Sequence, residues 1–434
     1  MRIAVLGGGT AGFIAAAHLT RYLPQAELLH IFDSRIPIIG VGEGTTPRFT
    51  TWFEEITGLG FSHLAEHCGA TLKKGSRYEG WGCAGTDFVH RFQPARLIAY
   101  HLDAAAVVHV LAEHVRATRI DARVDELRNS SNGIHVRLDN GTEYPCDYIF
   151  DARGFPRGDT EDVIRLDWIP TGRATIRRLS PQGLSGLTRI VARPHGWIFQ
   201  IPLRDWTSCG YVSNPNVSSD DEVAADFTAF LHDDGVFTWE QRVAPSFPNF
   251  MRRKVFDGRV FWIGNAASFI EPLEATTIGH AIGQVRSATR WISEVGKGRC
   301  ADDEEIGAFN SMTLSYMCCD SLFVAWHYAC GSRWDTAFWQ HARRGIERAQ
   351  QNPLVRAHWP QFEKYVEAGQ ALPGRALSRC EDQEGWDRDF FPLLRLYQPF
   401  GNFSEFNFAQ IGHGIGYYKT VRDVTQSSIV EADS

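Results

Sequence analysis

Three glycines near the N-terminus have a spacing that can bind phosphate groups. Gly7, Gly9 and Gly12 form the pattern Gly-x-Gly-x-x-Gly between a short apolar run and a helical stretch. The first glycine of such a pattern makes a tight turn, the second lets the backbone approach a pyrophosphate, and the third allows close helix–strand packing. The phosphates meet the N–H groups of the helix N-terminus, which here include Thr10 and Ala11. The residues predict a dinucleotide-binding turn, although a glycine turn without a ligand would have the same spacing.

An acidic residue lies where a dinucleotide site needs one. Asp33 follows a second apolar run, residues 28–32, and stands about twenty residues beyond the glycines, which is the place of the carboxylate that binds the ribose. Strand, glycine turn, helix, strand and acid thus follow one another as in a βαβ unit. The position of Asp33 at the expected distance from the glycines favours a dinucleotide site over a glycine turn without a ligand.

Two later strands also end in turns of small residues. Residues 148–154 read Tyr-Ile-Phe-Asp-Ala-Arg-Gly, and residues 258–267 read Gly-Arg-Val-Phe-Trp-Ile-Gly-Asn-Ala-Ala. Many FAD-dependent monooxygenases have Gly-Asp at the second turn, where the acid holds the ribityl chain. Asn265 keeps an acceptor oxygen there but lacks the charge. Each stretch alone could be an ordinary buried strand with its turn, but three such turns in this order favour FAD as the dinucleotide.

The overall composition restricts the partners of the chain. Its 434 residues carry 44 Lys and Arg against 51 Asp and Glu, a net charge of −7, so we expect neither nucleic acid nor an anionic membrane as a partner. No stretch is apolar over the 18 or more residues that a membrane-spanning helix requires. Nine cysteines are scattered without the spacing of metal ligands, which indicates reduced thiols in a cytoplasmic protein and no metal site.

Several longer motifs carry a resemblance to one enzyme family. Besides the glycine turn, they are residues 39–47 (Ile-Gly-Val-Gly-Glu-Gly-Thr-Thr-Pro), 70–73 (Ala-Thr-Leu-Lys), 269–277 (Phe-Ile-Glu-Pro-Leu-Glu-Ala-Thr-Thr) and, more weakly, 196–202 (Gly-Trp-Ile-Phe-Gln-Ile-Pro). With these motifs, residues 1 to about 290 resemble the flavin-dependent tryptophan halogenases and their relatives.

The resemblance implies FAD as the cofactor and adds contacts to it. Beyond the glycine turn, Asp33 and Asn265, the implied flavin-contacting residues are Gly40, Val41, Gly42, Glu43 and Pro272. A second Gly-x-Gly-x-x-Gly before a helix is absent from the sequence, so we expect no dedicated NAD(P)H domain. Reduced flavin would come from a separate reductase, or NAD(P)H would bind transiently near the FAD.

Two residues match the catalytic pair of the halogenases. In that family a flavin hydroperoxide forms, halide attacks its distal oxygen, and the hypohalous acid passes to a lysine beside the aromatic substrate, with a glutamate nearby. The motifs place the lysine at Lys73 and the glutamate at Glu274. An ammonium can polarise or capture the oxidant, and a carboxylate can take the proton lost as an indole regains aromaticity. Outside the motifs, Lys73 would be interpreted as a solvated lysine like Lys74, and Glu274 as an acid favoured by a helix dipole.

Three departures from the family pattern favour oxygen insertion over halogenation. The family's Glu-Ser-Thr-Gly becomes Glu-Ala-Thr-Thr at residues 274–277, so the β-branched Thr277 replaces the glycine beside which halide binds backbone N–H groups. The family's paired tryptophans, which are associated with preventing ordinary monooxygenation, correspond here to Trp197 and Phe199. Together with Trp81, these two residues are the candidates on the substrate side. The chain also looks shorter than typical members by a substrate-enclosing part, which suits a polypeptide substrate.

The departures make the chain similar to one relative of the halogenases in particular. It is the flavin monooxygenase that hydroxylates a tryptophan in the small subunit of quinohemoprotein amine dehydrogenase during maturation of its quinone cofactor. The leading interpretation is therefore an FAD-dependent monooxygenase that hydroxylates a tryptophan in a protein or peptide through a flavin C4a-hydroperoxide. A halogenase of tryptophan or another electron-rich aromatic, an FAD-dependent reductase and a non-catalytic FAD-binding protein remain as alternatives.

The expected fold is of the α/β class with α+β elements. The resemblance implies a Rossmann-like FAD-binding domain of the aromatic hydroxylase/halogenase type, a sheet-based substrate module and a helical C-terminal part. The expected segments are the first part of the FAD-binding domain at 1–155, the β-rich substrate-side module at 156–255, the closing strand and helix of the FAD-binding domain at 256–295, and the helical region at 296–434.

Overall fold

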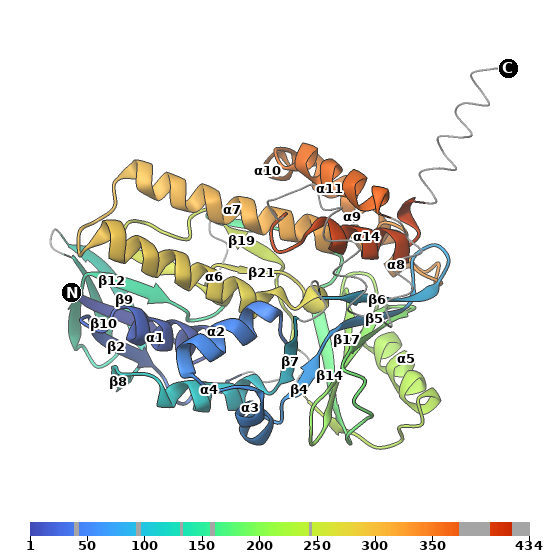
Figure 1. Ribbon diagram of the computed structural model, residues 1–434, viewed down its shortest axis with the longest axis horizontal. Coiled ribbons are helices and arrows are strands. Elements are labelled where there is room, and N and C mark those ends of the chain that lie inside the picture. Colours follow the sequence, from blue (N-terminus) through green and yellow to red (C-terminus); the bar gives the residue numbers. More distant parts are fainter. Residues whose placement is uncertain are drawn as a thin grey trace. The chain divides into compact units, whose positions relative to one another are not determined.

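The computed structural model describes residues 1–38, 43–92, 97–130, 133–156, 161–242, 245–372 and 400–418 (Figure 1). Its contacts divide the chain into two compact units. Unit 1 comprises residues 1–71, 99–165 and 250–314, and unit 2 comprises residues 72–98, 166–249 and 315–434. The expected α/β class is confirmed, whereas the division into four segments stays a prediction.

Unit 1 is built on a five-stranded parallel sheet with the strand order β20-β12-β1-β2-β8. The strands are β1 (Arg2–Leu6), β2 (Glu27–Phe32), β8 (Thr118–Asp121), β12 (Tyr148–Asp151) and β20 (Val260–Trp262). Their central residues form apolar runs, as is usual for parallel strands that are covered on both faces. One exception stands out in the register: Val5 of β1 lies between Phe150 of β12 and a histidine, His30 of β2.

Helices and a small meander cover this sheet. α1 (Thr10–Tyr22) packs against α4 (Ala104–Glu113) and α6 (Thr276–Trp291), and Figure 1 shows α1 beside α2 (Pro47–Thr57) and α6. The meander of β9 (Val124–Ser130), β10 (Gly133–Leu138) and β11 (Glu143–Cys146) packs its apolar side chains on those of β1, β2 and β12. Further elements of unit 1 are α3 (Phe61–Cys68), β3 (Glu43–Gly44), β7 (Ala99–Leu102), β13 (Val163–Arg165), β19 (Phe250–Arg252), β21 (Ser268–Phe269) and the short helices η1 (Gly264–Ala266), η2 (Pro272–Glu274) and η3 (Ile292–Gly296).

Unit 2 is built on a seven-stranded sheet with the order β18-β14-β17-β16-β15-β5-β6, antiparallel except between β15 and β5. Its strands are β5 (Gly75–Trp81), β6 (Thr86–Arg91), β14 (Arg173–Leu179), β15 (Thr188–Arg193), β16 (Gly196–Pro202), β17 (Thr207–Ser213) and β18 (Glu240–Gln241). Every residue of β16 and β17 is buried. α5 (Asp220–Asp233) begins at a capping box of Ser219 and Glu222 and packs its apolar residues on one face of the sheet.

The helices of unit 2 follow the sheet in sequence. α7 (Asp303–Trp326) continues from unit 1 into unit 2, as does the short strand β4 (Thr71–Lys73). It is followed by α8 (Ala337–Arg343), α9 (Gly345–Gln351), α10 (Pro353–Arg356), α11 (Trp359–Ala371) and α14 (Glu405–Gly414). Of the helices in the described ranges, none is long and apolar enough to cross a membrane.

Candidate functional site

The glycine turn has one open position between two crowded ones. Gly7 adopts φ +116°, and a Cβ there would lie 2.5 Å from the carbonyl oxygen of Ala152. A Cβ on Gly12 would lie 2.0 Å from the carbonyl oxygen of Gly7. Gly9 has no heavy atom within 4 Å of its Cβ position. Packing thus requires the outer glycines, whereas the middle one faces space that a ligand can fill.

The N-terminus of α1 is left without a protein cap. Gly9 is its N-cap and offers no side chain, and the first backbone bond of the helix runs from Phe13 N–H to Gly9 O, 3.1 Å. The N–H groups of Thr10 and Ala11 find no acceptor in the described part of the chain. Unused donors at the positive end of a helix dipole attract anionic groups. This end of α1 therefore fits the pyrophosphate of a dinucleotide.

Asp33 follows the last residue of β2, as the sequence predicts. Arg35 donates to its carboxylate through Nε at 2.7 Å and Nη2 at 2.8 Å, and these bonds hold the pKa of Asp33 below its usual value. Arg35 itself is largely exposed. The carboxylate is thus ionised and fixed in place, and it keeps lone pairs that a ribose diol can use.

The turn that follows β20, at the same edge of the sheet, is held by the side chain of Gln284, which the sequence motifs do not reveal. Gly264 follows β20 with φ +55°, and a Cβ there would lie 2.5 Å from the Cβ of Ala11. Its N–H donates to Oε1 of the buried Gln284, 2.8 Å away. The next residue, Asn265, is half-buried, and its side chain makes no hydrogen bond to the described residues. Asn265 can therefore offer its amide to a ligand, as predicted for the ribityl chain.

The turn that follows β12 carries an ion pair between the buried Asp151 and the partly exposed Arg153. Arg153 donates through Nε and Nη2 to the two carboxylate oxygens of Asp151, at 2.9 and 2.7 Å. Burial lowers the pKa of Arg153, but the hydrogen bonds to Asp151 outweigh it and the net pKa is raised. The pair closes the carboxyl end of β12 next to Gly7.

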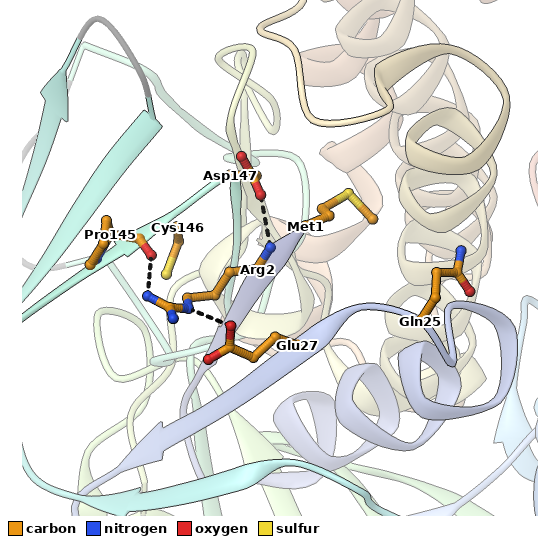
Figure 2. Close-up of a pocket in the computed structure, with 7 residues that line it drawn as sticks. All are labelled: Met1, Arg2, Gln25, Glu27, Pro145, Cys146 and Asp147. Atoms are coloured by element: carbon orange, nitrogen blue, oxygen red, sulfur yellow. Dashed lines mark hydrogen bonds and ion pairs between the residues drawn. The ribbon is translucent and has the colours of Figure 1, made fainter.

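Figure 2 shows a pocket at the opposite, amino-terminal edge of the same sheet. Its volume is about 360 Å³, and Arg2, Glu27 and Asp147 are among the residues that line it. Ligands of open α/β sheets bind at the carboxyl ends of the strands. The pocket in Figure 2 is therefore not the dinucleotide site.

The other predicted flavin contacts are only partly described. Gly40, Val41 and Gly42 lie outside the described residues. Glu43, on β3, accepts a hydrogen bond from the N–H of Ala104 at 3.0 Å, so its carboxylate contacts the start of α4. Pro272 is exposed and begins η2. Their roles toward flavin stay predictions.

Glu274 ends η2 and is half-buried, directly before the start of α6. Ala275 then adopts the left-handed conformation, φ +53°, which is unusual for a residue other than glycine. α6 begins at Thr276 without a side-chain cap. Thr277 lies in the first turn and is partly exposed.

Lys73 is buried and is therefore not the solvated lysine that the sequence without its motifs would suggest. It ends β4 with only 3% of its surface exposed, whereas Lys74 beside it is exposed. Its Nζ lies 5.6 Å from the ring centroid of Phe92 in the same unit. A buried ammonium is costly unless a function or a partner retains it.

The three candidates on the substrate side lie together in unit 2. The ring centroids of Trp81 and Trp197 are 6.4 Å apart, and those of Trp197 and Phe199 are 6.2 Å apart. All three side chains are buried, and Trp81 also packs on Tyr328 and Trp339. In the described structure neither Trp81 Nε1 nor Trp197 Nε1 has a hydrogen-bond partner. They belong to an aromatic cluster at one end of the sheet, and their contact with substrate stays a prediction.

Sequence reasoning missed a polar cluster on β6. His90 of β6 is buried, and its ring centroid lies 6.5 Å from that of the buried His327. Asn407 of α14 donates through Nδ2 to Nε2 of His90 at 2.8 Å, because its Oδ1 accepts from Ser404 N–H at 2.7 Å. Gln410 of α14 accepts from the N–H of Arg91 at 2.7 Å. No short motif reveals these contacts, since α14 and β6 are more than three hundred residues apart.

Comparison with known proteins decides the family. The sequence model of the tryptophan halogenases matches residues 2–97 and 93–371. The chain belongs to the tryptophan halogenase family. It is 23% identical to tryptophan 7-halogenase RebH of Lentzea aerocolonigenes over 78% of each chain. It is 29% identical to the uncharacterized protein y4xG of Sinorhizobium fredii, over 78% of this chain and 79% of that protein.

Solved structures with low identity share the fold. Xcc4156, a flavin-dependent halogenase from Xanthomonas campestris, superposes with a TM-score of 0.76 at 22% identity, over 96% of this chain and 89% of its own. MibH, a lathipeptide tryptophan 5-halogenase, gives a TM-score of 0.75 at 20% identity, over 96% of this chain and 85% of its own.

The comparisons confirm the family resemblance and the prediction of an oxidoreductase enzyme. They favour the halogenase alternative over the leading interpretation of tryptophan hydroxylation in cofactor biogenesis. The family implies FAD, and the carboxyl edge of the unit 1 sheet fits it: an uncapped helix N-terminus, open space beside Gly9 and the acceptors Asp33 and Asn265. When bound, FAD would supply the redox chemistry with dioxygen.

Proposed function

We propose that this chain is an FAD-dependent halogenase of an indole or another electron-rich aromatic ring, with Lys73 as the residue that handles the oxidant. The observation that carries the proposal is the burial of Lys73 beside an exposed Lys74, within the motif that marks the family's lysine. A sheltered ammonium can hydrogen-bond an electrophilic oxygen species and keep it from diffusing into water. Glu274 takes the proton released when the ring regains aromaticity.

The start of α6 supports halide binding despite the missing family glycine. Thr276 and Thr277 lie in an uncapped first turn, so their N–H groups point to where an anion is favoured. Thr277 adds side-chain bulk but removes no N–H donor. A halide in this chain therefore has less room than in relatives with glycine, and we expect weaker halide binding rather than none.

A second candidate function is hydroxylation of a tryptophan in a polypeptide. Two observations favour it: Thr277 stands in place of the family glycine, and Phe199 stands in place of the second of the family's paired tryptophans. A peptide substrate is compatible with either chemistry, and the likeness in fold to MibH, a lathipeptide tryptophan 5-halogenase, supports testing one. Reduced flavin would come from a separate reductase.

One assay separates the two functions. The chain is supplied with FAD, a flavin reductase, NADH and dioxygen, and is offered indole, free tryptophan and tryptophan-containing peptides with and without bromide. Mass spectrometry distinguishes a brominated product, by its isotope doublet, from an oxygenated one. A brominated product supports the proposal. An oxygenated product that forms equally well without bromide would contradict it and favour the second candidate.

The role of Lys73 is tested against its neighbour. Lys73→Ala should reduce product formation by at least about a hundredfold, while flavin reoxidation continues, because the lysine acts after the flavin. Lys74→Ala is the matched control and should keep wild-type activity, since its side chain is exposed. Full product yield from Lys73→Ala, or equal losses in both variants, would remove Lys73 from the mechanism.

A further inference from the structure

A buried histidine of unit 1 contacts the dinucleotide turn from inside the sheet. His30 stands in β2 among apolar residues and is 0% exposed. Its Nε2 lies 2.9 Å from the carbonyl oxygen of Gly7. A carbonyl oxygen can only accept, so Nε2 carries the proton and donates it. Nδ1 is then an unprotonated acceptor, and it is buried without a partner in the described structure.

This hydrogen bond completes the attachment of Gly7 to β2. The N–H of Gly7 donates to the carbonyl oxygen of Ile31 at 2.9 Å, so both polar groups of Gly7 bind the neighbouring strand. In a trans peptide the C=O and the following N–H point in opposite directions. With the Gly7 carbonyl directed at His30, the N–H of Gly8 is directed away from it. The bond therefore fixes how the turn presents its N–H groups.

Packing holds the imidazole in this orientation. Its ring centroid lies 4.6 Å from that of Phe13, edge to face, and 4.8 Å from that of Phe32. A Cβ on Gly12 would lie 2.0 Å from the Gly7 carbonyl oxygen that accepts this bond, so the glycine leaves room for the contact. Burial lowers the pKa of His30 to about 4, which keeps the ring neutral at neutral pH, and the hydrogen bond to the Gly7 carbonyl sets its tautomer.

We propose that His30 is a positioning residue for FAD: by holding the Gly7 carbonyl, it orients the backbone N–H groups that bind the pyrophosphate before the cofactor arrives. The inference rests on the proposed binding of FAD at this turn, and His30 acts through the turn rather than by touching the ligand. An apolar residue in β2 would pack equally well but would leave the Gly7 carbonyl without this donor. Preorganised donors bind an anion with less loss of entropy, so the effect should appear in cofactor affinity.

Three variants separate this role from a merely structural one. His30→Leu removes the donor, and His30→Gln places a side-chain N–H near the position of Nε2. His18→Leu is the matched control, because His18 is a second buried histidine of unit 1 whose Nδ1 accepts from Trp52 Nε1 at 3.2 Å. For each full-length apoprotein, the FAD dissociation constant is measured by quenching of flavin fluorescence. Amide hydrogen exchange is measured in the peptide that spans residues 6–13.

The proposal expects FAD binding about tenfold weaker in His30→Leu and within about threefold of wild type in His30→Gln and His18→Leu. Exchange in residues 6–13 should be faster in His30→Leu alone. Wild-type affinity and exchange in His30→Leu, or equal losses in His30→Leu and His30→Gln, would overturn it. If wild-type protein does not bind FAD, the proposed function fails, and the exchange measurement still shows whether His30 holds the turn.

Discussion

The two ends of the parallel sheet in unit 1 are made by the same strands but are built in opposite ways. At the amino end, side chains satisfy one another: Arg2 Nε lies 2.9 Å from Glu27, and the N–H of Arg2 donates to Asp147 at 2.7 Å (Figure 2). At the carboxyl end, Gly7 and Gly264 keep the turns free of side chains, and the start of α1 has no cap. The amino end is electrostatically closed, whereas the carboxyl end keeps donors and space for a ligand.

The difference between the two ends shows why a pocket alone is weak evidence for a ligand-binding site. The pocket at the amino end is large enough to hold a small molecule, but its charges are already paired. The carboxyl end is marked instead by backbone N–H groups at the start of α1 that the described part of the chain leaves unused, in a turn that is partly exposed. Because unpaired N–H groups at the positive end of a helix dipole attract anions, they point to an anionic ligand.

The largest effect should come from filling the crowded part of the carboxyl end. Gly12→Ala would place a Cβ 2.0 Å from the carbonyl oxygen of Gly7, and backbone must move to relieve the clash. We expect a loss of about 1–3 kcal/mol or more in the free energy of unfolding, measured by urea denaturation. Gly60→Ala is the control, since no heavy atom lies within 4 Å of its Cβ position. Equal stability of the two variants would show that the turn is not packed as described.

A fall in pH should destabilise unit 1 through two buried imidazoles. Burial lowers the pKa of His18 to about 3 and that of His30 to about 4, so both rings are neutral in the folded chain. The unfolded chain binds these protons near the ordinary pKa of 6.5. Their contribution is therefore complete above pH 6.5 and is lost as pH falls from 6.5 toward 4, by about 1.4 kcal/mol per unit for each histidine.

The check is the unfolding free energy measured between pH 7 and pH 5. Replacing His30 by Gln should reduce the slope of the unfolding free energy against pH in this range, because unfolding then takes up one proton fewer. An unchanged slope in His30→Gln would mean that His30 is protonated in the folded protein, which would also weaken the argument for a single tautomer under the glycine turn.

The smallest effect should come from the amino end. Arg2→Ala removes an ion pair with Glu27 that is one-third to one-half exposed, and such pairs contribute about 0–1 kcal/mol. FAD affinity should stay at the wild-type value because this end presents no donors to the cofactor. A flavin titration in Arg2→Ala that shows strongly weakened binding would place the site at the wrong edge of the sheet.

Local sequence patterns could predict the carboxyl end because its chemistry is local in the chain. The spacing of Gly7, Gly9 and Gly12 encodes the turn, and the βαβ order fixes where Asp33 must lie. The supporting side chains could not be found in this way. His30 stands in an otherwise ordinary apolar strand, and Gln284 lies in the middle of α6, so only the folded structure shows that each binds a glycine of a turn.

Unit 2 was harder to predict for the same reason. The motif identified Lys73, but its burial depends on packing that no pattern of lysines encodes. Trp81, Trp197 and Phe199 were singled out by family motifs, yet their exposure is at most 6%, as in a core cluster. The contacts of His90 and Asn407 join β6 to α14, which lies beyond the residues that match the family.

The central claim, that the carboxyl end of this sheet binds FAD, is tested most directly by titrating FAD into Gly9→Val apoprotein. The Cβ of Gly9 meets no protein atom, so the variant should fold with nearly wild-type stability. Its side chain would occupy the space assigned to the pyrophosphate, and we expect flavin binding to be lost. A folded Gly9→Val protein with wild-type FAD affinity would contradict the account.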